Sequence, residues 1–295
     1  MTVLQAIILG IVQGITEFIP ISSTAHLVFA SRLIGLYDGV DAALRAEQTT
    51  ATIGVIQLGT LLALLVYFAR DIVNITRAFV RDHLALFSGK RREGGGVQLS
   101  HDAWLGWLVI IGSVPVAVVG LLFKHQIEGT FTKNLWVIAT MMIAVGLLLA
   151  VAEWVGKRER SDQQLRITDA LAVGFAQVLA LIPGSSRSGS TIMGGLFAGL
   201  TRETAARFSF LLSIPAIAAS GVLELKEAMH KLPEGSYVPL IAATVVSGLV
   251  GYASIWFLLR FLRTHSTGVF IVYRVVVGAV ILFALVGGYM TASVG

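Results

Sequence analysis

The sequence predicts an all-α integral membrane protein, with six transmembrane helices plus two re-entrant helical hairpins in an inverted-topology repeat. Three observations lead to this prediction. The chain of 295 residues is 56% hydrophobic and only 13% charged, whereas soluble domains carry about 25% charged residues. Six apolar stretches are long enough to cross a bilayer. One polar phrase, Gly-x-x-Gln followed by apolar residues, a Pro, one further residue and Ser-Ser, occurs twice, at 10–26 and 174–189, each time interrupting a further apolar stretch.

The expected spans follow from length, because a transmembrane helix needs about 20 apolar residues. They lie at roughly 50–69, 104–123, 135–155, 203–225, 238–262 and 268–291. Stretches 3–36 and 168–200 are also long enough to enter the membrane, but Pro20 and Pro183 break them. Broken backbone is tolerated at that depth only inside protein or beside a water-filled cavity. We therefore expect each of these two stretches to form a hairpin that enters and leaves on one side.

Basic residues predict the orientation, since cytoplasmic loops of membrane proteins are rich in Lys and Arg. They gather in the connections 70–103 and 156–166, and at Arg260 and Arg263. These segments should face the cytoplasm, and the glycine-rich stretch 93–103 should be a flexible loop there.

The remaining loops, at 124–134 and 226–237, should lie outside together with both termini. Basic cytoplasmic loops also account for the net charge of +5, so we expect membrane lipids and no nucleic acid as partners. The chain has no cysteine, which excludes disulfides and thiolate metal sites.

The span plan divides a single membrane domain, residues 1–295, into two repeats, 1–155 and 168–291. Each repeat is a hairpin followed by three spans. Because three is odd, the second hairpin should enter from the face opposite the first, so the repeat is inverted. In such folds the functional site lies near the midplane, where the broken helices converge.

The first copy of the polar phrase carries candidate metal ligands. Gln13 and Glu17 are four residues apart and share a helix face. An amide and a carboxylate oxygen suit Mg²⁺ or Ca²⁺. A packing hydrogen bond is the alternative for Gln13, whereas an ionisable group at membrane depth, such as Glu17, indicates function.

The same copy continues past Pro20 into hydroxyl groups and a histidine. Ser22, Ser23 and Thr24 could cap the following helix or contact a substrate. His26 could act as a general base or as a nucleophile, or be a structural donor.

The second copy predicts an anion site. Glycine, a helix N-terminus and Arg187 together suit phosphate; a flexible linker with one snorkelling arginine is the alternative. The candidate phosphate contacts are Gly184, Ser185, Ser186, Ser188 and Thr191. Arg274, in the last span, is either a further phosphate contact or a snorkelling residue.

At these residues the sequence resembles the bacterial undecaprenyl-diphosphate phosphatases of the bacitracin-resistance type. Gln13 and Glu17 match a Glu/Gln-x-x-x-Glu motif. Pro20 to His26 match Pro-x-Ser-Ser-Thr-Gly-His, with Ala25 in place of Gly, and Pro183 to Thr191 match Pro-Gly-x-Ser-Arg-Ser-x-x-Thr in full. Further similarity covers nearly the whole chain, at Val55–Gly59, Gly112–Pro115 and Phe208–Pro215.

The resemblance implies hydrolysis of the C55 isoprenoid diphosphate to the monophosphate, which recycles the carrier lipid for peptidoglycan synthesis and lowers bacitracin sensitivity. It also implies Mg²⁺ or Ca²⁺, a multi-pass protein of the bacterial cytoplasmic membrane with a site open to the outer face, and often a homodimer.

On this reading Glu17 and Gln13 hold the metal and Arg187 holds the terminal phosphate. Ser23 attacks with His26 as base, or His26 attacks itself. A transporter or flippase for a phosphorylated lipid or small anion is the alternative function, because inverted repeats with broken helices are common in transporters.

Overall fold

The computed structural model describes residues 1–87, 99–123, 134–232 and 235–292. Six of the helices in these segments are long and apolar enough to cross a membrane, which confirms the predicted spans. They are α3 (Ala42–Tyr67), α5 (His101–Leu122), α7 (Leu135–Val155), α10 (Arg202–Lys231), α11 (Tyr237–Leu262) and α12 (Gly268–Val286). Helix α10 runs further than expected, into the segment predicted as the loop 226–237.

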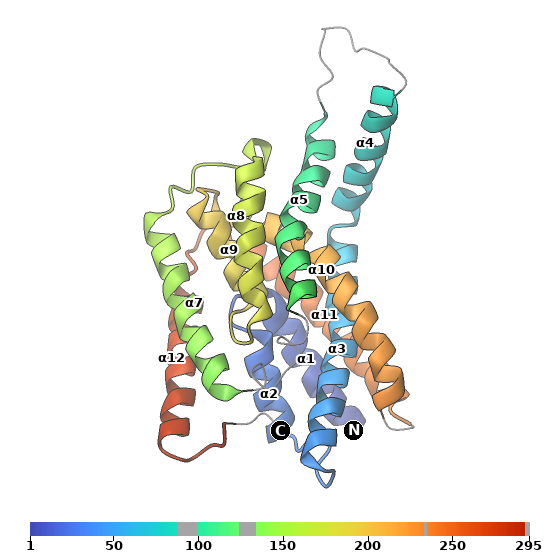
Figure 1. Cartoon of the computed structure of the whole chain (residues 1–295), viewed down its shortest axis with the longest axis vertical. Helices are drawn as coiled ribbons and strands as arrows, with labels where there is room; N and C mark the ends of the chain where they lie inside the picture. The colour runs from blue at the N-terminus through green and yellow to red at the C-terminus, as the bar shows by residue number, and fades with distance from the viewer. Residues whose placement is uncertain (88–98, 124–133, 233–234, 293–295) are drawn as a thin grey trace.

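The two remaining apolar stretches are broken helices, as the prolines predicted. The first consists of α1 (Val3–Phe18) and α2 (Ser23–Leu33). The second consists of α8 (Ile167–Val178), the 3₁₀ turn η3 (Leu179–Leu181) and α9 (Arg187–Phe197). In Figure 1 the α1–α2 pair opens toward the end of the molecule that holds both termini, and the α8–α9 pair opens toward the opposite end.

Most of the connection 70–103 is helical, which was not predicted from the sequence. Helix α4 (Ala69–Phe87) follows α3 after Phe68, and α5 already begins at His101. Helix α4 has many charged residues but also an apolar face, on which the centroid of the Phe79 ring lies 5.4 Å from that of Trp107 on α5. The glycines 94–96 and the loop 124–133 lie outside the described residues.

Helix α4 is also tied to the start of α5. Asp82 accepts a hydrogen bond of 2.8 Å from the backbone N–H of Ser100, which caps α5. Hydrogen bonds from Ser100 lower the pKa of the Asp82 carboxyl to about 2, so this tie remains charged at every physiological pH.

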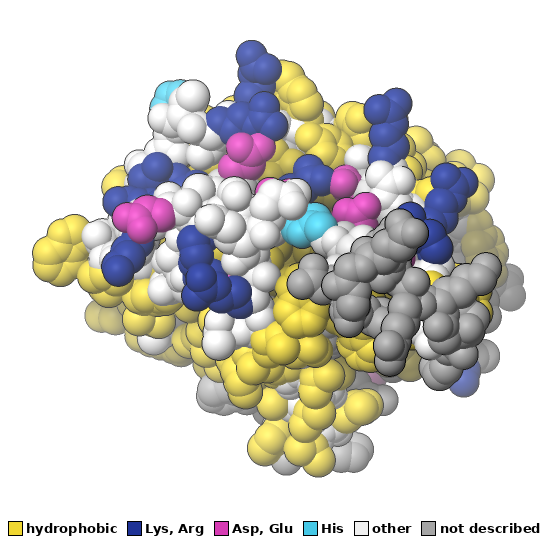
Figure 2. All heavy atoms as spheres, turned by 90° about the horizontal axis from the view of Figure 1, so that it is seen from above, with side chains coloured by type: hydrophobic (Ala, Val, Ile, Leu, Met, Phe, Trp, Pro, Cys, Tyr) yellow, Lys and Arg dark blue, Asp and Glu magenta, His cyan; other side chains and the backbone are white. Residues whose placement is uncertain are grey.

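The described parts of the basic connections share one end of the molecule, the upper end in Figure 1. Figure 2 looks onto this end and shows Lys and Arg beside Asp and Glu. Glu153, at the end of α7, binds Arg158, Arg202 and the Thr267 hydroxyl. Arg207 likewise pairs with Asp71. These ion pairs tie the ends of α7, α10 and α12 together, and α10 to α4.

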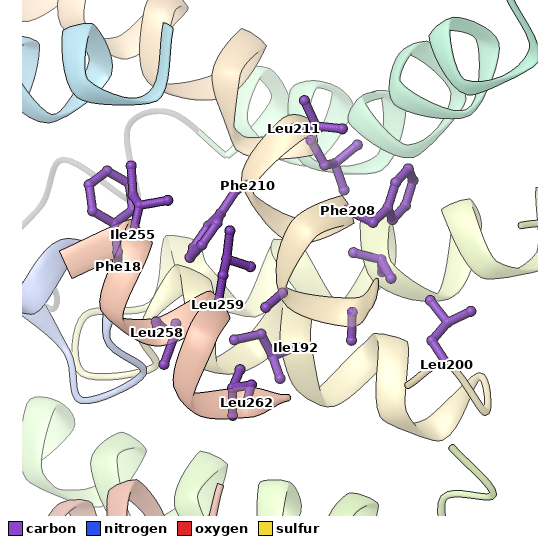
Figure 3. Close-up of a cluster of buried hydrophobic side chains, with 14 of the residues drawn as sticks. Phe18, Ile192, Leu200, Phe208, Phe210, Leu211, Ile255, Leu258, Leu259 and Leu262 are labelled. Carbon is purple, nitrogen blue, oxygen red and sulfur yellow. The ribbon is translucent and has the colours of Figure 1, made fainter. Parts of the chain in front are cut away.

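The largest apolar cluster packs the tip of the first broken pair against the second half of the chain. Phe18, the last residue of α1, lies edge-on to Phe210 of α10, with ring centroids 5.4 Å apart. Figure 3 shows Ile192 of α9 and Ile255 of α11 in the same cluster. In a membrane, where lipid is as apolar as leucine, such close packing replaces the hydrophobic effect as the source of helix association.

The glycine that opens each polar phrase faces a neighbouring helix. A Cβ on Gly10 of α1 would lie 2.5 Å from the Ala243 carbonyl oxygen of α11. A Cβ on Gly174 of α8 would collide with the Gly112 carbonyl of α5. Both broken helices therefore approach a spanning helix more closely than any larger residue permits.

Candidate functional site

The two helix breaks lie side by side, and one side chain joins them. Arg274 of α12 is fully buried. Its Nη1 donates to the Pro20 carbonyl oxygen of the first break at 3.4 Å, and its Nη2 donates to the Ser185 carbonyl of the second at 2.9 Å. Nη2 also reaches Gly184, while Nε donates to Met142 of α7 at 3.1 Å. The guanidinium thus links both breaks to α7.

This placement gives Arg274 a role that neither sequence hypothesis described. Three of its hydrogen bonds go to backbone carbonyls at the breaks, those of Pro20, Gly184 and Ser185, where the interrupted helices leave carbonyls without helical partners. The others go to carbonyls of α7. A snorkelling arginine would extend to the membrane surface, whereas this one is sealed inside. A phosphate contact by Arg274 stays a prediction. The hydrogen bonds in the structure join the two breaks to each other and to α7, and we call this arrangement the Arg274 staple.

A second link between the breaks is an ion pair. Arg187 Nη2, from the start of α9, lies 3.5 Å from Glu17 Oε1, near the end of α1. Glu17 is 8% exposed. Its other oxygen accepts a hydrogen bond of 3.1 Å from Gln13 Nε2. The predicted metal ligands and the predicted phosphate ligand therefore meet in one place.

In the first break, helix α2 begins with its cap in an unusual conformation. Ser22 has φ +80° and makes no side-chain capping bond, so its hydroxyl does not fill the N-cap role. Ser23 is the first residue of α2 and is half-buried, while Thr24 is exposed. His26 follows one turn later: its Nδ1 lies 2.7 Å from the Ser22 carbonyl oxygen, and its Nε2 lies 2.7 Å from the Tyr273 hydroxyl of α12.

In the second break, the chain turns at Gly184, which has φ +93°. A Cβ there would collide with the Ile138 carbonyl of α7, so only glycine fits. Ser186, with φ +66°, caps α9, and its Oγ accepts from the Gly189 N–H at 3.2 Å and contacts Ser188 Oγ at 3.2 Å. Arg187 is then the first residue of the helix.

Thr191 is positioned by α9 rather than held open for a ligand. Its hydroxyl donates to the Arg187 carbonyl oxygen at 2.7 Å and lies 2.5 Å from Ser209 Oγ of α10. Contact between this hydroxyl and a phosphate stays a prediction, and the structure favours a role in holding α9.

The structure also corrects the alignment of the two phrases. The sequence pairs Ser22–Ser23 with Ser185–Ser186, because each pair follows Pro and one further residue. The positive-φ caps are instead Ser22 and Ser186. The same number of residues separates Gln13 from Ser22 as separates Gln177 from Ser186. Ser23 therefore corresponds to Arg187, and His26 to Ser190.

Several buried polar atoms around the breaks have no hydrogen-bond partner among the described residues. They are Gln13 Oε1, Ser22 Oγ, Ser185 Oγ, Arg187 Nη1 and Ser190 Oγ. An unpaired buried polar group costs about 1–3 kcal/mol, so a cluster of them indicates a binding site for a polar ligand. Ser190 was not among the predicted residues; the run Arg-Ser-Gly-Ser at 187–190 carried its signal.

The donor set suits a hard divalent cation held jointly with its ligand. Gln13 Oε1 is a buried oxygen without a partner, and Glu17 supplies a carboxylate beside it. The described residues contain no group of three or more His, Cys, Asp or Glu side chains that could hold a metal. Mg²⁺ fits such a site, since it commonly takes one or two protein oxygens and completes its shell with phosphate and water.

Comparison with known proteins assigns the chain to a family. The family model described as "Bacitracin resistance protein BacA" matches residues 6–280. The chain belongs to this family. It is 52% identical over 283 residues to the undecaprenyl-diphosphatase of Syntrophobacter fumaroxidans, covering 96% of this chain and 97% of the relative.

Family members of lower identity match over slightly longer stretches. The undecaprenyl-diphosphatase of Mycolicibacterium vanbaalenii is 47% identical over 295 residues, covering 99% of this chain and 100% of the relative. That of Chlorobium phaeobacteroides is 46% identical over 302 residues with the same coverage. The match extends across both broken helix pairs, so the whole site lies within the shared region.

Proposed function

We propose that this protein is an undecaprenyl-diphosphatase, which hydrolyses undecaprenyl diphosphate to undecaprenyl phosphate and inorganic phosphate. Relatives that match it along nearly their whole length carry that name. The observation that carries the proposal is the contact between Glu17 and Arg187, which joins a cation-binding group and a phosphate-binding group across the two breaks. Membership of a bacitracin-resistance family supports a role in recycling the carrier lipid for peptidoglycan synthesis.

The second break holds the terminal phosphate. Arg187 has one guanidinium nitrogen at Glu17 and another buried without a partner among the described residues, which leaves the latter for a phosphate oxygen. The N-terminus of α9 adds backbone N–H groups and positive potential beside Ser185 and Ser188. These groups stabilise the charge that builds up on the phosphoryl group as it transfers.

The first break supplies the groups that react. Glu17 and Gln13 would hold the cation, which when bound neutralises charge on the diphosphate oxygens. Ser23 Oγ attacks the terminal phosphorus, the bond to the undecaprenyl phosphate oxygen breaks, and His26 takes the serine proton. Water then releases the phosphate from Ser23. Attack by His26 itself remains the rival route.

We also propose that both broken pairs are re-entrant and related by an inverted repeat, 1–155 with 168–291. Three features support this. The pairs open toward opposite ends of the bundle (Figure 1), Gly10 and Gly174 pack in the same way on α11 and α5, and the basic residues gather at one end. By the positive-inside rule that end faces the cytoplasm. We place the protein in the bacterial inner membrane. The site then opens outward, and a homodimer is the proposed assembly.

Phosphate release tests the activity directly. Purified protein in detergent, given undecaprenyl diphosphate and Mg²⁺, should release phosphate, and Arg187→Ala should lose about 10²-fold or more in kcat. Broken helix pairs also occur in transporters. Movement of the lipid across the membrane of sealed vesicles, with no phosphate release, would contradict the hydrolase proposal and support a transporter.

A further inference from the structure

We propose that Tyr273 is a positioning residue that fixes the ring orientation of His26. The inference rests on the proposed function, because it concerns the histidine that removes the proton. Tyr273 lies on α12, far from His26 in the sequence, yet its hydroxyl is 2.7 Å from His26 Nε2. The two rings are stacked, with centroids 5.6 Å apart and planes inclined by 14°.

The two hydrogen bonds of His26 define one tautomer. The partner of Nδ1 is the Ser22 carbonyl oxygen at 2.7 Å, and a carbonyl can only accept. Nδ1 therefore carries the hydrogen of the neutral ring. Nε2 then carries the lone pair of the ring, and the Tyr273 O–H donates to it. Nε2 is thus the only ring nitrogen that can take a proton, and the Ser23 proton reaches it once the Tyr273 hydroxyl gives up this hydrogen bond.

The neighbouring residue Arg274 determines the position of Tyr273. Arg274 is fully buried and bonded to Pro20, Gly184 and Ser185. Tyr273, the preceding residue on α12, is 41% exposed. One short stretch of α12 therefore both joins the breaks and holds the imidazole beside them. Correct orientation of a general base by a second side chain is a common requirement of such sites.

Replacing Tyr273 by Phe removes the hydroxyl and keeps the stacked ring. We expect kcat for phosphate release to fall about tenfold, because the imidazole is no longer held in one orientation toward the reacting groups, while KM changes little. Tyr252→Phe is the matched control. Tyr252 is 45% exposed on α11 and also packs on an aromatic ring, that of Tyr67 at 5.2 Å.

A chemical readout separates this proposal from the activity. Diethyl pyrocarbonate acylates an unprotonated imidazole nitrogen, and peptide mass spectrometry gives the rate at each histidine. In Tyr273→Phe the rate at His26 should rise several-fold, because Nε2 loses its partner, while the rate at His265 stays unchanged. Tyr252→Phe should match wild type at both.

An unchanged rate at His26 in Tyr273→Phe would overturn the proposal. So would a rise in KM with an unchanged kcat. If wild type releases no phosphate, the hydrolase proposal fails, but the acylation rates still decide whether Tyr273 holds Nε2.

Discussion

The two helix breaks share a backbone but differ in chemistry. Each follows a helix with a buried Gln, each bends at a Pro, and each restarts at a serine in a positive-φ conformation. At the first position of the restarted helix, one break has Ser23 and the other Arg187. One turn before the break, the first has Glu17 where the second has Leu181.

This difference explains how a duplicated element can form one asymmetric site. The shared frame brings two helix N-termini together, which favours an anion between them. The side chains that differ give the two breaks different chemical groups. The first break has a carboxylate, a hydroxyl and an imidazole, and the second has a guanidinium. Neither break alone has both a cation ligand and a phosphate ligand.

The largest expected effect comes from removing the link between the breaks. Arg274→Ala leaves several buried carbonyl oxygens without a donor and opens a cavity, so we expect a loss of stability of about 3 kcal/mol or more. Thermal unfolding in detergent measures it. Arg260→Ala is the control, since Arg260 is exposed and lies over Trp256. Equal melting temperatures for the two variants would contradict the claim that Arg274 stabilises the protein by joining the breaks.

Gly184→Ala should damage the second break alone. The positive φ costs about 1–2 kcal/mol for any residue with a Cβ, and the collision with the Ile138 carbonyl adds a displacement of the phosphate-binding turn. We expect kcat/KM to fall at least tenfold. Gly39 has φ +87°, and a Cβ added there would meet nothing within 4 Å, so Gly39→Ala has the same backbone strain without the collision. Similar activity in both variants would contradict the account.

The two buried glutamines give a smaller, matched comparison. Gln13 donates to Glu17, whereas both side-chain polar atoms of Gln177 lack a partner among the described residues. Gln13→Leu should raise the Mg²⁺ concentration needed for half-maximal phosphate release several-fold. Gln177→Leu should leave that concentration unchanged, because the second break has Leu181 at the position of Glu17 and so has no carboxylate beside Gln177. An equal shift in both would mean that the cation is not held at the first break.

The sequence was sufficient for the spans and for the two breaks, because hydropathy and proline act locally. It did not predict α4, whose charges resemble those of a loop while Phe79 packs on Trp107 of α5. It aligned the breaks by their prolines, although the caps at Ser22 and Ser186 define the structural register. The roles of Tyr273 and Arg274 depend on contacts across more than 200 residues, which no local pattern can reveal.

The central claim is that Glu17 and Arg187 act as one site across the two breaks. A double-mutant cycle of Glu17→Gln and Arg187→Gln, followed by kcat/KM for phosphate release, tests it most directly. Each single change should cost about 10²-fold, and the double variant should be little worse than either single one, because interacting residues are not additive. A double variant that loses about 10⁴-fold, the product of the two, would show that the breaks work independently.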